Sequence, residues 1–509
     1  MNAEERLAEL HSIDQECVRL ERIAAVLQWD QETYLPPQGV AERSEQLALI
    51  QGLAHDRSTA PKIGELLAEL GSDSANPSGD ERLPPVERDF LRVLRKDYDR
   101  KILLPSDFVS SAARAEGLSQ AAWVIARRNN DFAAFKPHLQ KMIEISRKKA
   151  EYWGYQGAGI YDALLDCYEP GLRAQDIAPL FAILQERLSA LLAKIRAHGG
   201  NESEDDFLAK EYAPEKQAAY SQILMDRIGF DKTRGRIDVS AHPFTTTLGA
   251  HDIRITTRYV ELNFLSSIFS TLHESGHGLY ELNIAPVLLG GSLGAGVSMG
   301  IHESQSRFWE NLIGRSRAFW QGQYRDLQQM FPEQLAGLSL DAFYRGINRV
   351  RPGLIRIEAD EVCYSLHIIL RFELEQKLFS GELTVDELPE TWRIRMEELL
   401  GVRPETDSEG VLQDVHWSSG YFGYFPSYAL GNCYGLQFWN KLQEDLPGVE
   451  NAISQGKFED LHAWLRDAIH AWGRRLDPPD LLRQVTGESL SVFPFLNYIE
   501  SKFSELYGI

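Results

Sequence analysis

The stretch His273-Glu274-Ser275-Gly276-His277 determines how this chain builds a functional site. Residues four apart lie on one face of an α-helix, so the two imidazoles can bind the same metal ion. Glu274 follows the first histidine directly and can reach a water held by that metal. This is the H-E-x-x-H pattern of zinc peptidases, in which the histidines bind zinc and the glutamate acts as general base.

The sequence around this stretch predicts a helix over residues 259–282. The two histidines lie at the border of an apolar stripe, and Gly276 and Gly278 each weaken a helix by about 1 kcal/mol relative to Ala. We therefore expect another segment to approach the helix backbone closely at these glycines. The alternative is a polar helix surface that carries two histidines by chance. The stripe is formed by Leu265, Ile268, Phe269, Leu272 and Leu279.

A catalytic zinc ion needs a third protein ligand and one open position. Glu303 is the best candidate, because it lies 26 residues after His277, near the start of another predicted helix. The Gly-rich turn at 288–300 is long enough for that helix to return antiparallel to the first. Two alternatives stay open: Glu303 is an exposed glutamate favoured by a helix start, or His302 is the ligand.

The amino-acid composition and net charge indicate which kinds of partner this chain can bind. The chain has 509 residues, 43% of them hydrophobic and 25% charged, as is ordinary for a soluble globular protein. Its net charge of −21 argues against binding to nucleic acid or to an anionic membrane surface. The same charge allows attraction of cationic peptides.

The N-terminal segment, the apolar runs and the cysteines of the sequence together predict a cytoplasmic protein. Residues 1–6 are not a basic segment followed by an apolar run, so no signal peptide is expected, and no stretch of 18 apolar residues predicts a membrane span. The four cysteines are scattered and form no C-x-x-C pair, as expected for buried thiols in a reducing compartment. They are Cys17, Cys167, Cys363 and Cys433.

Helical periodicity dominates the rest of the chain and predicts a mostly α fold. Period-two patterns over 234–261 predict a small set of strands just before the metal helix, and the edge of that sheet could pair with an extended peptide. Residues 401–426 are rich in loop-forming residues. Before the strands, helices are predicted over 3–28, 41–70, 86–103 and 106–152.

Six motifs follow one another over about 175 residues. They are His242-Pro243-Phe244, Asp252-Ile253-Arg254-Ile255-Thr256, His273 to His277, His302-Glu303-Ser304-Gln305, Ile355-Arg356-Ile357-Glu358-Ala359-Asp360, and Gly410-Val411-Leu412-Gln413-Asp414-Val415-His416-Trp417. In content and order they resemble the M32 metallocarboxypeptidases typified by carboxypeptidase Taq. The segment Trp29-Asp30-Gln31-Glu32-Thr33-Tyr34 is also similar to that family.

The resemblance implies a cytoplasmic carboxypeptidase that removes C-terminal residues one at a time with broad specificity. It implies one zinc ion on His273, His277 and Glu303, replaceable by cobalt, with Glu274 as base. It also implies a homodimer and a helical gluzincin fold similar to neurolysin and angiotensin-converting enzyme. That fold has a deep groove and a small antiparallel sheet before the metal helix.

One peptidase domain is then expected over residues 1–509, with a catalytic core over about 234–430. The turn-rich connection at 71–85 suggests that the N-terminal helices, about residues 1–104, form a mobile lid over the groove.

An exopeptidase must recognise a free carboxylate, which a guanidinium binds through two oxygens at once. Arg356 and Arg254 lie inside matched motifs, and Arg356 is favoured. The alternative for each is an internal salt bridge, with Asp360 or Asp252 as the partner. His242 and Asp252 are expected to shape the site.

The tetrahedral oxyanion of peptide hydrolysis needs a further donor. His416, in a polar loop, is the leading candidate, and the aromatic run after it offers Tyr424 and Tyr428. Related helical zinc peptidases use a tyrosine shortly after such a histidine. Spacing does not choose between the two tyrosines, and packing is the alternative role for all three residues.

Metal-bound histidines usually donate their second N–H to a carboxylate, for which Asp360, Glu310 and Asp414 are candidates. Two other functions remain possible at this point. One is a zinc endopeptidase or oligopeptidase with the same chemistry. The other is a zinc-stabilised peptide-binding protein without turnover, although a structural zinc site has no use for Glu274 and closes all four positions.

Overall fold

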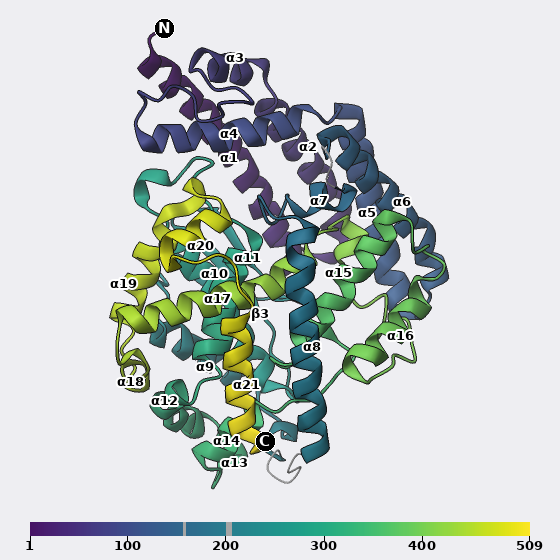
Figure 1. The fold of residues 1–509 in the computed structure, drawn as a ribbon, viewed down its shortest axis with the longest axis vertical. Coiled ribbons are helices and arrows are strands. Elements are labelled where there is room, and N and C mark those ends of the chain that lie inside the picture. Colours follow the sequence, from purple (N-terminus) through teal and green to yellow (C-terminus); the bar gives the residue numbers. More distant parts are fainter. Residues whose placement is uncertain (156–158, 200–205) are drawn as a thin grey trace.

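The computed structural model describes residues 1–155, 159–199 and 206–509. Within these residues it contains twenty-one α-helices and one three-stranded sheet, so the prediction of a mostly α fold is confirmed (Figure 1). None of the described helices combines the length and apolar character needed to cross a lipid bilayer. Cys17, Cys363 and Cys433 are buried as expected, whereas Cys167 is exposed.

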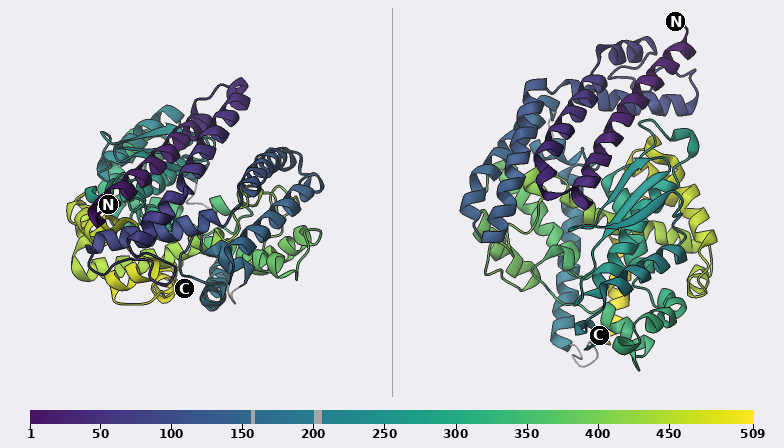
Figure 2. Two further views of the ribbon diagram at one scale, coloured as in Figure 1. Left: turned by 90° about the horizontal axis from the view of Figure 1, so that it is seen from above. Right: turned by 180° about the vertical axis from the view of Figure 1, so that it is seen from behind.

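The N-terminal helices lie at one end of the molecule, where α1 and α2 run side by side (Figures 1 and 2). The predicted helix over 41–70 is two helices, because Pro61 has no N–H to continue α2 and begins α3 instead. The connection at 71–84 joins α3 to α4 and so lies within this group of helices. The bounds are α1 Ala3–Thr33, α2 Val40–Ser58, α3 Pro61–Glu69 and α4 Pro85–Ile102.

The predicted helix over 106–152 is also two helices. Asn130 ends the first in the left-handed conformation (φ 55°), and the Asp131 side chain caps the second by accepting from the N–H of Ala134. The helices between this break and the sheet are α5 Ser106–Asn129, α6 Phe132–Trp153, α7 Ile160–Leu165, α8 Ala174–His198 and α9 Pro214–Arg227.

The sheet consists of β1 Gly235–Val239, β2 Thr245–Gly249 and β3 Asp252–Thr257 in the order β1-β3-β2. It lies before the metal helix as predicted, but it is mixed: β2 and β3 form an antiparallel hairpin, whereas β1 runs parallel to β3. The predicted antiparallel pairing is therefore confirmed for β2 with β3 and wrong for β1 with β3. A period-two pattern identifies the face of a strand that is buried but does not specify the direction of its neighbour.

The H-E-x-x-H helix is α10, Phe264–Leu282, and it begins where the Asn263 side chain accepts from the N–H of Ser266. Its glycines lie where neighbours approach, as predicted. A Cβ at Gly276 would lie 2.5 Å from the carbonyl oxygen of Gln305, and one at Gly278 would lie 2.6 Å from the Phe230 ring. Gly276 therefore allows α11, Met299–Arg307, to lie against α10.

Helix α11 also packs against α17. α17 is buried along most of its length, and a Cβ at Gly431 on this helix would lie 2.6 Å from Cγ of Glu303. After α11 and a π-helical turn at Phe308–Ile313, the helices are α12 Arg317–Met330, α13 Pro332–Leu335, α14 Leu340–Ile347, α15 Tyr364–Ser380, α16 Leu388–Leu400, α17 Phe425–Asp445, α18 Val449–Ser454, α19 Glu459–Ala468, α20 Pro478–Thr486 and α21 Phe493–Tyr507.

Candidate metal centre

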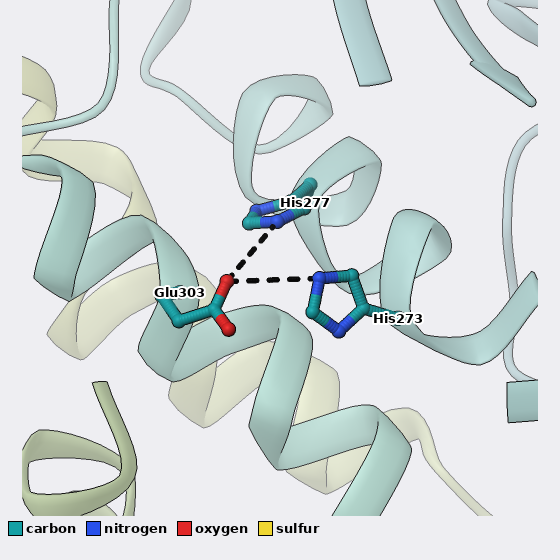
Figure 3. A group of neighbouring side chains, drawn as sticks. All are labelled: His273, His277 and Glu303. Atoms are coloured by element: carbon teal, nitrogen blue, oxygen red, sulfur yellow. Dashed lines mark ion pairs between the residues drawn. The ribbon is translucent and has the colours of Figure 1, made fainter. Parts of the chain in front are cut away.

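His273, His277 and Glu303 converge on one point between α10 and α11 (Figure 3). Nε2 of each histidine lies 3.6 Å from Oε2 of Glu303, and the carboxylate is 4% exposed. Metal–ligand bonds of about 2.0–2.2 Å at tetrahedral angles separate ligand atoms by roughly 3.3–3.6 Å, so this donor set fits a zinc-like ion. The structure thus brings the three predicted ligands together.

His273 is oriented by a carboxylate on the far side of its ring. Its Nδ1 lies 2.8 Å from Oε2 of Glu310, one of the three acids considered from the sequence. Burial alone would raise the pKa of Glu310, but Arg307 and the hydrogen bond from His273 lower it to about 2. An ionised Glu310 fixes the N–H of His273 on Nδ1 and leaves Nε2 for a metal.

His277 has a histidine as its partner instead of an acid. Its Nδ1 lies 2.7 Å from Nδ1 of His302, and Nε2 of His302 lies 2.8 Å from Oε1 of Glu281. Glu281 also accepts from the hydroxyl of Thr247 and the N–H of Gly296. His302 is therefore placed to orient the ring of His277, and it does not belong to the group of three side chains that could hold a metal ion. Glu281 follows His277 by four residues on the same helix face, a spacing that could have revealed it.

We expect His302→Ala to weaken metal binding by about ten- to hundredfold, because loss of an outer partner frees the ring of His277 to rotate. Competition with a chelator measures this affinity. His251→Ala serves as the control, since His251 is exposed on the turn between β2 and β3. A His302→Ala protein that holds metal as tightly as the unsubstituted chain would contradict the assigned role.

Arg307 ties the acids of this centre together and was missed from the sequence. Its Nε donates to Oε1 of Glu303 at 2.7 Å, and its Nη1 donates to Oε2 of Glu310 at 3.0 Å. The guanidinium also lies over the Tyr364 ring. Oε1 of Glu303 is thus held by Arg307, while Oε2 accepts from the Ser306 hydroxyl at 3.1 Å and faces the two histidines. The i,i+4 spacing from Glu303 was the available signal.

Glu274 lies on the same helix with its carboxylate held from the sheet. The Thr245 hydroxyl on β2 donates to Oε2 of Glu274 at 2.6 Å, a contact that no sequence spacing indicated. Burial raises the pKa of Glu274 above its ordinary value, against the lowering effects of His273 and Thr245. A raised pKa suits a carboxylate that must accept and release a proton.

These residues open onto a cleft of about 850 Å³. Arg254 and Asp252 are not among its lining residues: they form an ion pair with each other, and the Arg254 guanidinium lies 4.1 Å from the centre of the Trp29 ring. The cleft lining includes the metal ligands and Glu274 together with His242, Arg356, His416, Tyr424 and Tyr428.

Arg356 is 5% exposed and belongs to a buried charge cluster. Its Nε and Nη2 donate to Oδ1 of Asp414 at 3.0 and 2.9 Å, and its Nη1 donates to the Tyr364 hydroxyl at 3.1 Å. Asp414 also pairs with Arg371, and although burial opposes it, the two guanidinium groups hold the pKa of Asp414 below its ordinary value.

Asp360, which was considered as the partner of Arg356, instead accepts backbone N–H groups of Arg351, Val362 and Cys363. No hydrogen bond within the described part of the chain joins Asp360 or Asp414 to His273 or His277, so Glu310 is the one of the three predicted acids that binds either ring. Arg356 thus forms an internal salt bridge, as the sequence suggested, but its partner is Asp414 instead of Asp360.

The three predicted oxyanion donors form one cluster. Nε2 of His416 lies 3.1 Å from the Tyr428 hydroxyl, and the ring centres of Tyr424 and Tyr428 are 5.2 Å apart. The pKa of His416 is lowered to about 3, mainly by burial and next by the charge of Arg356, so the imidazole is neutral near pH 7. A neutral imidazole and two phenols supply hydrogen-bond donors without adding charge to the cleft.

Comparisons with known proteins agree with this geometry. The family model for carboxypeptidase Taq (M32) metallopeptidases matches residues 9–503. Carboxypeptidase 1 of Bacillus subtilis (strain 168) is 40% identical over 490 residues, covering 95% of each chain. Thermostable carboxypeptidase 1 of Thermus thermophilus is 40% identical over 516 residues, covering 100% of each. The crystal structure of an M32 carboxypeptidase from Deinococcus radiodurans R1 has a TM-score of 0.94 at 39% identity, covering 99% of this chain and 100% of that one.

Proposed function

Because the chain belongs to the carboxypeptidase Taq (M32) metallopeptidase family and is a metallocarboxypeptidase, we propose that it uses one zinc ion to release single C-terminal residues from peptides with broad specificity. The observation that carries the proposal is the convergence of His273, His277 and Glu303 beside Glu274 in one cleft. Cobalt is expected to replace zinc at such a donor set.

His273, His277 and Glu303 would hold the zinc ion, which would supply Lewis acidity for the carbonyl and for the attacking water. Glu274 accepts the proton of the attacking water and passes it to the leaving amine. The Thr245 hydroxyl holds that carboxylate in place, and its hydrogen bond to Oε2 supports this assignment. A zinc-stabilised binding protein would not need such a base.

His416, Tyr424 and Tyr428 are the proposed donors to the oxyanion. Two features support this role: all three line the cleft, and the neutral His416 ring still carries one N–H.

Arg356 is the proposed receptor for the substrate carboxylate. Its hydrogen bonds to Asp414 and the Tyr364 hydroxyl use one N–H on each of its three nitrogens. Each terminal nitrogen of a guanidinium carries two N–H groups, so one on each remains for the two oxygens of a substrate carboxylate. We favour Arg356 over Arg254, which lies outside the cleft lining. His242 shapes the cleft wall.

The substrate backbone is proposed to extend along β2. The order β1-β3-β2 gives this strand one neighbour in the sheet, and Thr245 and Thr247 of β2 line the cleft. A peptide that adds to a sheet edge gains backbone hydrogen bonds that do not depend on its sequence, consistent with broad specificity.

By family resemblance we also propose that the protein is a cytoplasmic homodimer. In each subunit, the helices α1–α4 are proposed to act as a lid over the cleft.

Matched peptides with free and amidated C-termini test the exopeptidase assignment. We expect the free peptides to yield a timed ladder of products, each shorter by one residue, and the amidated peptides to resist, because an amide removes the charge that Arg356 would bind. Mass spectrometry of timed samples, with metal analysis of the same enzyme, provides the measurement. Equal cleavage of both series, at internal bonds, would identify an endopeptidase or oligopeptidase instead.

A further inference from the structure

We propose that Glu375 on α15 is a positioning residue that holds the loop carrying His416 and Tyr424 in its reactive place. The inference rests on the proposed function of that loop in binding the oxyanion. It assigns a task to a buried carboxylate that belongs to none of the six motifs and does not line the cleft.

Glu375 binds the loop at both ends. Its Oε1 accepts from the indole N–H of Trp417 at 2.7 Å, and its Oε2 accepts from the backbone N–H of Gly423 at 3.0 Å. Trp417 directly follows His416, and Gly423 directly precedes Tyr424. One carboxylate thus fixes the two points from which both proposed donors extend.

The opposite side of the loop is equally confined. Gly423 has φ 84°, and a Cβ there would lie 2.7 Å from the backbone nitrogen of Leu165 at the end of α7. The backbone at this point is therefore held between α7 and Glu375. Movement away from the carboxylate would carry Tyr424 with it, because the two residues share a peptide bond.

The buried charge itself argues for a positioning role. Glu375 is 0% exposed, and its third hydrogen bond comes from the Tyr161 hydroxyl at 2.8 Å. The nearby Arg371 pairs with Asp414 instead, and burial raises the pKa of Glu375 to about 7. An ionisable group that costs stability when buried is expected where its directed hydrogen bonds serve another purpose.

No hydrogen bond or ion pair among the described residues joins Glu375 to His273, His277 or Glu303. Loss of its carboxylate should therefore change the reaction without removing the metal. This separation distinguishes a positioning role from a general role in folding.

Glu375→Gln is the principal test. Glutamine has nearly the same size, but its amide has one oxygen acceptor and would direct an NH2 group at donors of the loop. We expect kcat to fall about ten- to hundredfold, with KM and bound metal unchanged, because only interactions made in the transition state are lost. Affinity for a phosphinic peptide that mimics the tetrahedral intermediate should fall by the same factor as kcat/KM.

Tyr161→Phe is the matched control. It removes a hydrogen bond from the same carboxylate without releasing the loop, so kcat should stay close to that of the unsubstituted enzyme. Trp417→Phe removes the hydrogen bond between the indole N–H and Glu375 while keeping the carboxylate. It should lower kcat and leave KM unchanged, so it tests the proposal even if Glu375→Gln folds poorly. Unchanged kcat in folded, metal-loaded Glu375→Gln, or equal losses in Tyr161→Phe and Trp417→Phe, would overturn the proposal.

His416→Ala separates this inference from the proposed function. If His416→Ala lowers kcat but Glu375→Gln does not, the loop acts in catalysis and the positioning role of Glu375 is wrong. If His416→Ala retains full kcat, the oxyanion assignment itself is wrong, and the inference drawn from it is overturned with it.

Discussion

Glu274→Gln is expected to keep its metal and to lower kcat by about 10²–10⁴-fold, the usual contribution of a general acid–base group. The glutamine oxygen can still accept the hydrogen bond from Thr245, so the side chain should keep its place. An amide cannot take a proton from water at neutral pH, so the chemical step loses its base. Steady-state kinetics on an unmodified peptide, together with metal analysis, measure both parts of the prediction.

Glu358→Gln is a suitable control for the loss of a negative charge from the cleft. Glu358 also lines the cleft, but it is exposed and pairs with Arg258 at 2.9 Å. We expect this variant to retain kcat. Unchanged turnover in Glu274→Gln would remove the proposed base, and metal loss in that variant would show that Glu274 supports binding instead.

The parts of the metal centre that could be predicted are those set by helical spacing. His273 and His277 share a face because they are four residues apart, and the close contacts of Gly276 were expected from the cost of a glycine inside a helix. Glu303 was found because a turn of suitable length returns its helix antiparallel to the first. In each case, local geometry restricts the arrangement to very few possibilities.

Two residues that hold the proposed ligands in place could have been predicted from helical spacing. Glu281 follows His277 by four residues and Arg307 follows Glu303 by four, so each lies on the helix face of a proposed ligand. The Glu281 side chain reaches His302, and Arg307 reaches both Glu303 and Glu310. Applying the i,i+4 rule to every candidate ligand would have identified both residues.

Other contacts could not be predicted from helical spacing, because they join residues that are far apart in the sequence. Arg356 and Asp414 are 58 residues apart, and only the folded chain brings them within hydrogen-bond distance. Helical spacing offers Asp360 as the alternative salt-bridge partner of Arg356, but the Asp360 carboxylate binds backbone N–H groups instead. Likewise the parallel pairing of β1 with β3 depends on a crossover, which alternating hydrophobicity does not encode.

The second large effect is expected for Glu303→Gln, which should weaken metal binding by more than the roughly ten- to hundredfold typical of an outer partner. Glutamine keeps the packing against Gly431, so the fold should persist. The neutral amide no longer offsets the charge of Arg307, whose Nε lies 2.7 Å from the present carboxylate. A guanidinium without that counterion then repels a cation held by the two histidines.

Metal content after dialysis, and activity as a function of added zinc, measure this loss. High zinc should restore part of the activity of Glu303→Gln, because Glu274 and the oxyanion donors remain in place, whereas zinc should not rescue Glu274→Gln. This contrast separates a ligand from a base, because only the loss caused by Glu303→Gln depends on the zinc concentration. If Glu303→Gln bound zinc as tightly as the unsubstituted chain, another group would have to be the third ligand.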